Sequence, residues 1–393
     1  MRTKHAVHSL PAFPVYSCAF VGPDEVVLGG GGGQSKTGIK NKLRLYEIKA
    51  ENDIDLRDEL ELASGEDAPM SMTADATSKQ LICGINSALD SLKDGTNQNC
   101  RAYGIQEGKL SLLKTRSTLT IDGVEDDYQA MTALSPDNTL LAVAGTRDLA
   151  ILQYPTLDPV ASPIHLPKGE IYDASFSSSK LVIATTVSLL VYALPTKPEE
   201  SEKAAGKQKE TLPELELLST IDRPTVPGSD AGSSFRAARF LPEDPKVLYT
   251  VVNTVAPKKA KKNAPKRAYI CKWDTDTWTM KKFRKISDRA VTCFDISPNG
   301  ALLAFGSSDY TVGIVDAKTL APVLTILKAH EFPPTTLRFN PSSNLLVSGS
   351  ADNTIRVLTV PELLPESWSS WIIVVVTLLI ILFAIIAQQM HSS

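Results

Sequence analysis

The chain has 393 residues. A single globular core usually stops growing near roughly 300 residues, whereas repeat architectures lengthen by adding units. It holds 41 Lys and Arg against 44 Asp and Glu, and a formal net charge of −3 argues against a dedicated nucleic-acid binder, which is usually basic. Five scattered cysteines without CxxC spacing argue against a zinc ribbon or a disulfide framework and favour reduced, buried thiols.

Residues 1–20 lack an apolar segment of the length that a secretory signal needs, so we expect the body of the chain not to be secreted. That body consists of short alternating strands separated by Asn, Pro, Ser, Gly and Asp, and the pattern recurs. Phrases such as SPDNTLLAVAG are typical of WD-repeat blades. Seven copies begin at Val15, Met70, Tyr128, Ile171, Ser234, Ala290 and Pro334. The sequence therefore predicts an all-β fold, a seven-bladed WD-repeat β-propeller over residues 1–361, although the blade-closing Trp-Asp pair is mostly absent.

A glycine-rich loop over residues 29–41 interrupts the first copy. Gly29, Gly30, Gly31, Gly32 and Gly33 end a strand, and a propeller does not need such a run to close. Glycine enters the φ > 0 regions without steric penalty, and a run of glycines exposes backbone amides and carbonyls to a partner or an ion. The segment therefore carries the most functional information in the chain.

Three interpretations of this loop stay open. Residues 30–37, GGGGQSKT, resemble a phosphate loop, but Ser35 replaces the required glycine and no helix follows. A long, unstructured hairpin loop is the second interpretation. The third is an ordered recognition loop in which Ile39 forms a small apolar wedge beside the amide of Asn41, with Gly38 and Lys40 around them.

Two charged insertions interrupt later blades. Residues 196–214 are charged and poor in apolar side chains, which predicts a linker-like loop. Residues 256–267, APKKAKKNAPKR, form a basic run that suits an anionic membrane surface, a nuclear signal or a plain solvated hairpin loop.

The C-terminal end carries an uncharged apolar segment. Residues 371–387, WIIVVVTLLIILFAIIA, have a length near the lower limit for a membrane-spanning helix. Trp368 and Trp371 at one end suit the membrane–water interface. We expect a single C-terminal transmembrane helix over 371–387, after a stem at 362–370 and before a short luminal tail at 388–393. A span this close to the end predicts tail-first insertion with the propeller in the cytosol. Its shortness favours the thinner membrane of the endoplasmic reticulum.

Motifs for catalysis are missing from the sequence. There is neither a Gly-x-Ser-x-Gly elbow nor an HExxH motif, and the five histidines are not paired at metal-binding spacing. We therefore expect a binding protein without covalent chemistry of its own.

The combination of GGGGG…TGIKNKL, seven weak blades and a terminal span resembles the Sec-twelve family, also called the prolactin regulatory element-binding protein family. The resemblance implies a guanine nucleotide exchange factor that promotes GDP release from a Sar-type small GTPase at the endoplasmic reticulum membrane. That step initiates coat-protein-complex-II vesicle formation in ER-to-Golgi transport. The partners it implies are the GDP-bound and nucleotide-free GTPase and the membrane, with no nucleic acid.

The resemblance also assigns residues. It implies that Ile39 and Asn41 contact the GTPase and that Gly29 to Gly33 and Gly38 hold K+ through backbone carbonyls, which are suitable K+ ligands. Pro69, before the second blade, and His330, before the seventh, match family surface positions, although a strand-entry proline and a blade hydrogen bond explain them equally well. Lys40 stands where a proline is common in fungal members, and the family's luminal domain is nearly absent.

Two other functions stay open from the sequence. A membrane-tethered WD-repeat scaffold without exchange activity would bind its partner regardless of nucleotide state. A nuclear DNA-binding regulator is suggested by one of the family's names, and the terminal span and the net charge argue against it.

Overall fold

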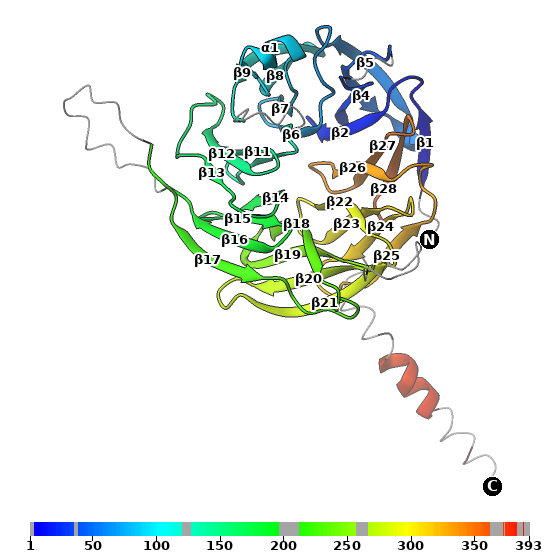
Figure 1. The fold of residues 1–393 in the computed structure, drawn as a ribbon. Coiled ribbons are helices and arrows are strands. Elements are labelled where there is room, and N and C mark those ends of the chain that lie inside the picture. The colour runs from blue at the N-terminus through cyan, green and yellow to red at the C-terminus, as the bar shows by residue number, and fades with distance from the viewer. Residues whose placement is uncertain are drawn as a thin grey trace. The chain divides into compact units, whose positions relative to one another are not determined.

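The computed structural model describes residues 4–34, 38–119, 127–195, 212–256, 266–361, 372, 374–382 and 388. The chain divides into two compact units, residues 1–359 and 360–393, and each is considered by itself. Seven four-stranded antiparallel sheets form the first unit and are arranged as blades around a central axis (Figure 1). The predicted seven-bladed, all-β propeller is thereby confirmed.

The first four blades follow one another along the chain. Blade 1 contains β2 (Val15–Phe20), β3 (Glu25–Gly30), β4 (Lys42–Ile48) and β5 (Ile54–Glu61), with a 3-10 turn at Ala50–Asn52. Blade 2 contains β6 (Ser71–Asp75), β7 (Gln80–Gly84), β8 (Cys100–Gln106) and β9 (Lys109–Arg116), with the short helix α1 (Leu89–Lys93) between β7 and β8. Blade 3 contains β10 (Met131–Leu134), β11 (Leu140–Ala144), β12 (Asp148–Gln153) and β13 (Ile164–His165). Blade 4 contains β14 (Ile171–Phe176), β15 (Lys180–Thr185), β16 (Ser188–Ala193) and β17 (Leu217–Asp222).

The remaining blades close the ring. Blade 5 contains β18 (Ser233–Leu241), β19 (Asp244–Thr254), β20 (Ala268–Asp274) and β21 (Thr279–Ser287). Blade 6 contains β22 (Val291–Ile296), β23 (Leu302–Ser307), β24 (Val312–Asp316) and β25 (Pro322–Ile326). Blade 7 contains β26 (Pro334–Phe339), β27 (Leu345–Ser350), β28 (Thr354–Thr359) and, as its outermost strand, β1 (His5–Ser9). The predicted start of every blade lies within three residues of its first strand.

Closure of the ring was open from the sequence and is now defined. The N-terminal β1 pairs with β28 in the register His5↔Leu358 to Ser9↔Thr354, so the two ends of the propeller share one sheet. The seven sheets and their hydrophobic clusters lie within residues 1–359, which therefore hold their own core.

Burial follows the position of a strand in its blade. The second strands are largely buried, and all six residues of β23 and of β27 are buried, whereas the outermost β21 is largely exposed. Four of the five cysteines are buried, Cys293 is partly exposed, and none forms a disulfide in this structure. Burial is the main cause that raises the pKa of Cys18 and Cys293 to about 11, so these thiols are poor nucleophiles at neutral pH.

The antiparallel order gives the propeller two distinct faces. In every blade, the connection between the second and third strands and the connection to the next blade open on the same side, which we call the loop face. The glycine-rich segment, between β3 and β4, lies on the loop face. The third strand of blade 7, β28, ends at Thr359 on the opposite face.

The second unit is described at residues 360–361, 372, 374–382 and 388, and those from 372 onward are helical. Within this described part of the chain, no helix is both long enough and apolar enough to cross a bilayer. Residues 371, 373 and 383–387 of the predicted span lie outside the described residues, as do 362–370 of the stem. Residues 196–211 and 257–265 of the two predicted charged loops also lie outside them.

Candidate functional site

The first glycines of the run belong to the sheet and not to the loop. Gly29 and Gly30 are the last residues of β3, opposite Leu43 and Lys42 of β4. A Cβ atom on Gly29 would lie 2.6 Å from the Cβ of Pro69 and 2.5 Å from Ser17 Oγ, so a side chain does not fit there. The expectation that a propeller does not need this run of glycines is therefore corrected for Gly29, and also for Gly30, whose Cβ would collide with the Pro14 carbonyl.

The same close approach recurs around the ring. In four blades a glycine at the end of the second strand packs against a residue at the start of the next blade, the pairs being Gly29 with Pro69, Gly84 with Gln129, Gly306 with Pro334, and Gly349 with Val15. Pro69 is buried, and its carbonyl accepts a hydrogen bond of 2.6 Å from Ser17 Oγ. In this structure Pro69 is a blade-packing residue, and its contact with a partner stays a prediction.

The loop proper begins at Gly31 and is held from inside by Asn41. Gly31 has φ +140°, and the Asn41 side chain fills the space where a Cβ would lie. Asn41 Oδ1 accepts a hydrogen bond of 2.9 Å from Gly33 N, and Asn41 Nδ2 donates to Gly33 O at 3.0 Å and to Glu66 O at 2.7 Å. The Asn41 side chain is thus not presented to solvent, and Asn41 as a whole is 9% exposed.

A segment between blades 1 and 2 supports this anchor. Leu62 N donates a hydrogen bond of 2.9 Å to Asn41 O. The Glu66 carboxylate accepts from Ala63 N at 3.0 Å and pairs with Arg101 on β8 at 2.8 Å. Both side chains of this ion pair are largely buried, so breaking it leaves a desolvated charge. Blade 2 therefore holds the chain to which the glycine loop is tied.

The accessible part of the loop lies beyond this anchor. Gly38 and Lys40 are exposed, and Ile39 is half-buried. Lys40 forms an ion pair of 3.2 Å with Glu61, and Gln34 Nε2 donates to Ser87 O at 3.4 Å. Residues 35–37 lie outside the described residues. Ile39, the predicted apolar wedge, is therefore partly accessible, whereas Asn41 is buried.

An acidic residue that the sequence analysis missed stands beside the loop. Asp67 Oδ1 is 3.3 Å from the position of a Cβ on Gly33, and burial raises the pKa of the Asp67 carboxyl. In the sequence, Asp67 lies two residues before the candidate residue Pro69, which could have drawn attention to it. Only the fold shows that Asp67 lies beside Gly33. The described residues contain no cluster of three His, Cys, Asp or Glu side chains suited to a metal ion.

His330 is fixed inside blade 7. Its Nδ1 lies 2.8 Å from Thr354 Oγ1 and its Nε2 lies 2.9 Å from Ser348 Oγ. The side chain is fully buried, and burial lowers its pKa to about 4, so it is neutral near pH 7. This is the blade hydrogen bond that the sequence allowed, and a contact of His330 with a partner stays a prediction.

The loop face also carries exposed apolar side chains in the connections of several blades. Among the described connections between the propeller strands, six large apolar residues are exposed on the loop face, namely Leu89, Tyr128, Val255, Tyr310, Leu327 and Phe332. Leu212 is exposed in a connection on the opposite face. A cavity of about 420 Å3 opens at its centre, lined by residues that include Tyr16, Met70, Tyr128, Tyr172 and Arg236. A surface of this kind suits a protein partner.

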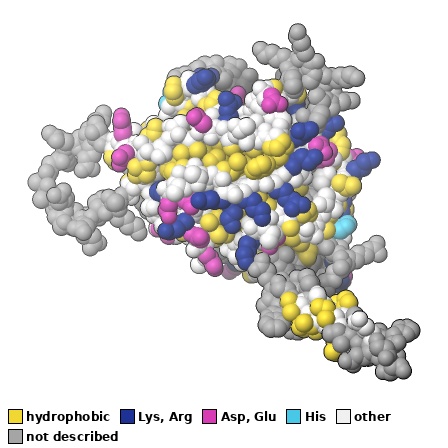
Figure 2. Space-filling view, turned by 90° about the horizontal axis from the view of Figure 1, so that it is seen from below, with side chains coloured by type: hydrophobic (Ala, Val, Ile, Leu, Met, Phe, Trp, Pro, Cys, Tyr) yellow, Lys and Arg dark blue, Asp and Glu magenta, His cyan; other side chains and the backbone are white. Residues whose placement is uncertain are grey.

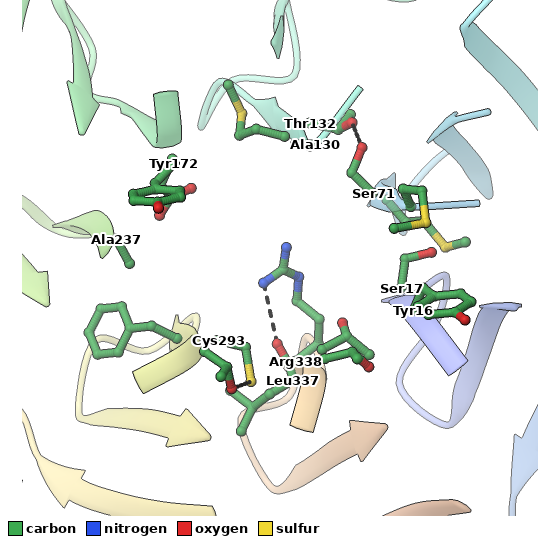
Figure 3. Close-up of a pocket in the computed structure, with 18 of the residues that line it drawn as sticks. Tyr16, Ser17, Ser71, Ala130, Thr132, Tyr172, Ala237, Cys293, Leu337 and Arg338 are labelled. Atoms are coloured by element: carbon green, nitrogen blue, oxygen red, sulfur yellow. Dashed lines mark hydrogen bonds between the residues drawn. The ribbon is translucent and has the colours of Figure 1, made fainter. Parts of the chain in front are cut away.

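Besides Arg236, the central channel has four charged residues that pair with one another. Four residues from the inner strands of blades 4 to 7 alternate in sign around it, Asp173, Arg239, Asp295 and Arg338. Arg338 extends toward the middle of the channel and donates to Leu337 O (Figure 3). The carboxylates of Asp173 and Asp295 also accept hydrogen bonds from backbone amides of the next blade. This set of four charged residues therefore joins the blades.

Comparison with known proteins shows which proteins this chain resembles. The model for the WD domain, G-beta repeat, matches residues 280–316 and 321–358. The guanine nucleotide-exchange factor SEC12 of Candida glabrata is 24% identical over 97% of this chain and 80% of its own length. SEC12 of Rattus norvegicus is 22% identical over 84% of this chain and 82% of its own length.

A solved structure supports the fold alone. Raptor of Chaetomium thermophilum superposes with a TM-score of 0.62 at 14% identity, covering 92% of this chain and 30% of that one. The match to SEC12 of Candida glabrata, in contrast, covers 97% of this chain and therefore includes the glycine loop. The chain is therefore similar, along nearly its whole length, to the SEC12 family of guanine nucleotide-exchange factors.

Proposed function

We propose that this protein is a guanine nucleotide exchange factor that promotes GDP release from a Sar-type small GTPase. On this proposal it acts at the endoplasmic reticulum membrane, where GDP release initiates coat-protein-complex-II vesicle formation. The observation that carries the proposal is the similarity to SEC12 exchange factors over 97% of the chain. The anchored glycine loop on an apolar face supports it, because such a loop offers a rigid element to a protein partner.

An exchange factor of this type changes affinities and forms no covalent bond. It binds the nucleotide-free GTPase more tightly than the loaded one, and by linkage the nucleotide and the exchange factor weaken each other by the same factor. Every 1.4 kcal/mol of this coupling is about tenfold in affinity. Coupling of several such steps needs a broad interface, which the apolar loop face can supply.

Within this interface we assign different roles to the predicted residues. Ile39, with its neighbours Gly38 and Lys40, contacts the GTPase, because these residues form the accessible part of the loop. Asn41 acts indirectly, by holding the loop in place, because its side-chain amide forms hydrogen bonds with Gly33 and Glu66. Pro69 and His330 keep their neighbouring segments in place for docking.

We further propose that K+ binds beside the loop. Gly29 and Gly30 are committed to the sheet, so the site narrows to Gly31, Gly32, Gly33 and Gly38. The donor set fits: carbonyl oxygens suit K+, and the half-buried Asp67 carboxylate adds negative charge beside Gly33. Bound K+ would supply positive charge that orders these carbonyls.

The membrane location rests on the apolar residues 371–387. We propose a single-pass anchor with the propeller in the cytosol and the C-terminal tail in the lumen.

Release of fluorescent GDP from a Sar-type GTPase tests the exchange proposal directly. We expect residues 1–361 to accelerate release, and we expect pull-downs to favour the nucleotide-free GTPase. Equal binding to the GDP-bound, GTP-bound and empty forms, without acceleration, would instead support a tethered scaffold. For the ion, hydrogen exchange of residues 29–34 should slow in K+ buffer relative to Na+ buffer, and identical protection in both would reject the K+ site.

A further inference from the structure

The charges of this chain are strongly segregated. Blade 5 and its loops, residues 233–289, contain fifteen Lys and Arg against five Asp and Glu, a net charge of +10. The remaining residues therefore sum to −13, because the whole chain carries −3. A near-neutral total thus conceals one basic blade in an acidic protein.

The outermost strand of blade 5 displays much of this charge. β21 presents five consecutive exposed residues, Lys281, Lys282, Phe283, Arg284 and Lys285. Figure 2 views this edge of the propeller and shows Lys and Arg side chains gathered in a band across it. We call these five residues the basic edge.

Half of these cations have no acidic partner. Lys281 pairs with Asp274 at 3.3 Å and Lys285 with Asp288 at 3.0 Å. Lys282 and Arg284 have no ion pair among the described residues. On the outer strand of blade 1, in contrast, Arg57, Asp58 and Glu59 all pair with neighbours.

The basic edge carries a cost in stability. Lys282 lies directly opposite Lys272 in the β20–β21 ladder, and like charges in that position repel. Phe283 is 42% exposed between the cations, although its ring packs edge-on against Tyr269 at 6.0 Å. Repulsion and an exposed aromatic ring are both explained if this edge meets an anionic surface.

We propose that the basic edge of blade 5 binds a lipid surface carrying anionic headgroups. Lys and Arg around an aromatic ring suit the interface of such a bilayer better than nucleic acid or a soluble acidic protein. This inference rests on the proposed membrane anchor. Residues 360–371 can span roughly 40 Å when extended, so the tethered propeller meets its own membrane at high effective concentration.

The location of the edge gives this contact a consequence for exchange. β21 lies on the circumference of the ring, as the outermost strand in the order β18-β19-β20-β21. A propeller that rests on its circumference leaves the loop face uncovered. Binding through the basic edge therefore places the glycine loop of blade 1 across the ring from the membrane contact and keeps it open to a GTPase (Figure 1).

Vesicle flotation of residues 1–361 tests the proposal, since this unit holds its own core and lacks the apolar segment. The test variant is Lys282→Gln with Arg284→Gln, which removes two exposed cations without breaking an ion pair. The matched control is Lys168→Gln with Lys328→Gln, which removes two exposed cations elsewhere. Circular dichroism and thermal unfolding verify that both variants are folded.

We expect the wild type and the control to float with phosphatidylcholine vesicles that contain phosphatidylserine, and not with phosphatidylcholine alone. Each basic side chain near an anionic surface contributes roughly fivefold in affinity, so the test variant should bind about 30-fold more weakly. Equal loss in both variants, or no binding to anionic vesicles, would overturn the proposal, as would binding of the edge to a soluble acidic protein but not to lipid.

A separate measurement distinguishes this inference from the exchange proposal. The test variant should accelerate fluorescent-GDP release in solution as well as the wild type does, because Lys282 and Arg284 lie within the outermost strand of blade 5, outside the connections that form the loop face, and the glycine loop belongs to blade 1 across the ring. Loss of vesicle binding with normal exchange supports both proposals. Normal vesicle binding without exchange in the wild type rejects the exchange proposal alone.

Discussion

Blades 1 and 7 are neighbours with the same strand order, yet the connections between their second and third strands are held differently. In blade 7 that connection is three residues, 351–353, and Asp352 accepts hydrogen bonds from Thr354 N and Glu331 N at 2.9 and 2.6 Å. In blade 1 it is eleven residues, 31–41, and the neutral amide of Asn41 holds it. The tight turn is held by the carboxylate of Asp352 within blade 7. The long loop is held through Glu66, which pairs with Arg101 of blade 2.

The comparison shows how one scaffold supports both stability and function. The turn of blade 7 lies in the region that matches the WD-repeat model. The loop of blade 1 departs from that pattern, and its supports Glu66 and Arg101 come from outside its sheet. Four predictions test this division.

The largest effect is expected from Arg101→Met. Removing one partner of a buried ion pair leaves the other charge uncompensated, which should cost about 3 kcal/mol of unfolding free energy. Urea denaturation measures the loss. Adding Glu66→Gln to this variant should recover part of it, and a loss of less than about 1 kcal/mol would show that the pair does not support blade 2 as we describe.

Lowering the pH should weaken blade 7 before it weakens the glycine loop. Burial, reinforced by Arg356 and opposed by Asp352, lowers the pKa of His330 to about 4, against about 6.5 in the unfolded chain. Between these values the unfolded state binds the extra proton, so stability falls as the pH falls from about 6.5 toward 4.

Thermal unfolding at pH 7 and pH 5 measures this dependence, with a shift of roughly 2–4 °C expected for every 1 kcal/mol lost. His330→Gln should flatten the curve because it removes the titrating group. If that variant keeps the full pH dependence, another group is responsible.

Asn41→Ala tests the anchor of the long loop. Three hydrogen bonds disappear, so we expect a loss of about 1–2 kcal/mol in stability and at least a tenfold decrease in stimulated GDP release. The matched control is Asn353→Gly in the turn of blade 7, where φ is +63° and glycine fits. If Asn41→Ala and the control variant stimulated GDP release equally, the anchor would not be needed for exchange activity.

The smallest effect is expected from Lys40→Gln. Lys40 and Glu61 form an exposed ion pair, and such pairs contribute only about 0.2–1 kcal/mol. Thermal unfolding should therefore change little, while a decrease in GDP release would identify Lys40 as a contact residue. A large fall in stability would contradict the exposed position of Lys40.

Local patterns were sufficient to predict the blades but not the contacts between them. Alternation and turn residues gave all seven blade starts, because each blade is a local meander. Closure through β1 required pairing across nearly the whole chain, His5 with Leu358, which no local pattern indicates. The sequence also could not separate the glycines of the sheet from those of the loop, since both look alike in a run of five.

The sequence marked the glycine-rich segment as the candidate site, and the fold changes the roles that its residues can play. Asn41 was expected as an exposed contact, whereas burial against Gly31 and Gly33 makes it an anchor. The packing role of Pro69 became visible only when the fold aligned it with Pro334, Gln129 and Val15. Register between blades is a property of the ring, and one sequence does not encode it in any short motif.

The most direct test replaces the long loop of blade 1 with the short turn of blade 7. Residues 31–41 are exchanged for Ala-Asp-Asn, the sequence of 351–353, and fluorescent-GDP release from a Sar-type GTPase is measured in K+ buffer with residues 1–361. We predict a folded propeller that no longer accelerates release. Acceleration equal to that of the unmodified propeller would contradict the claim that this loop carries the exchange activity.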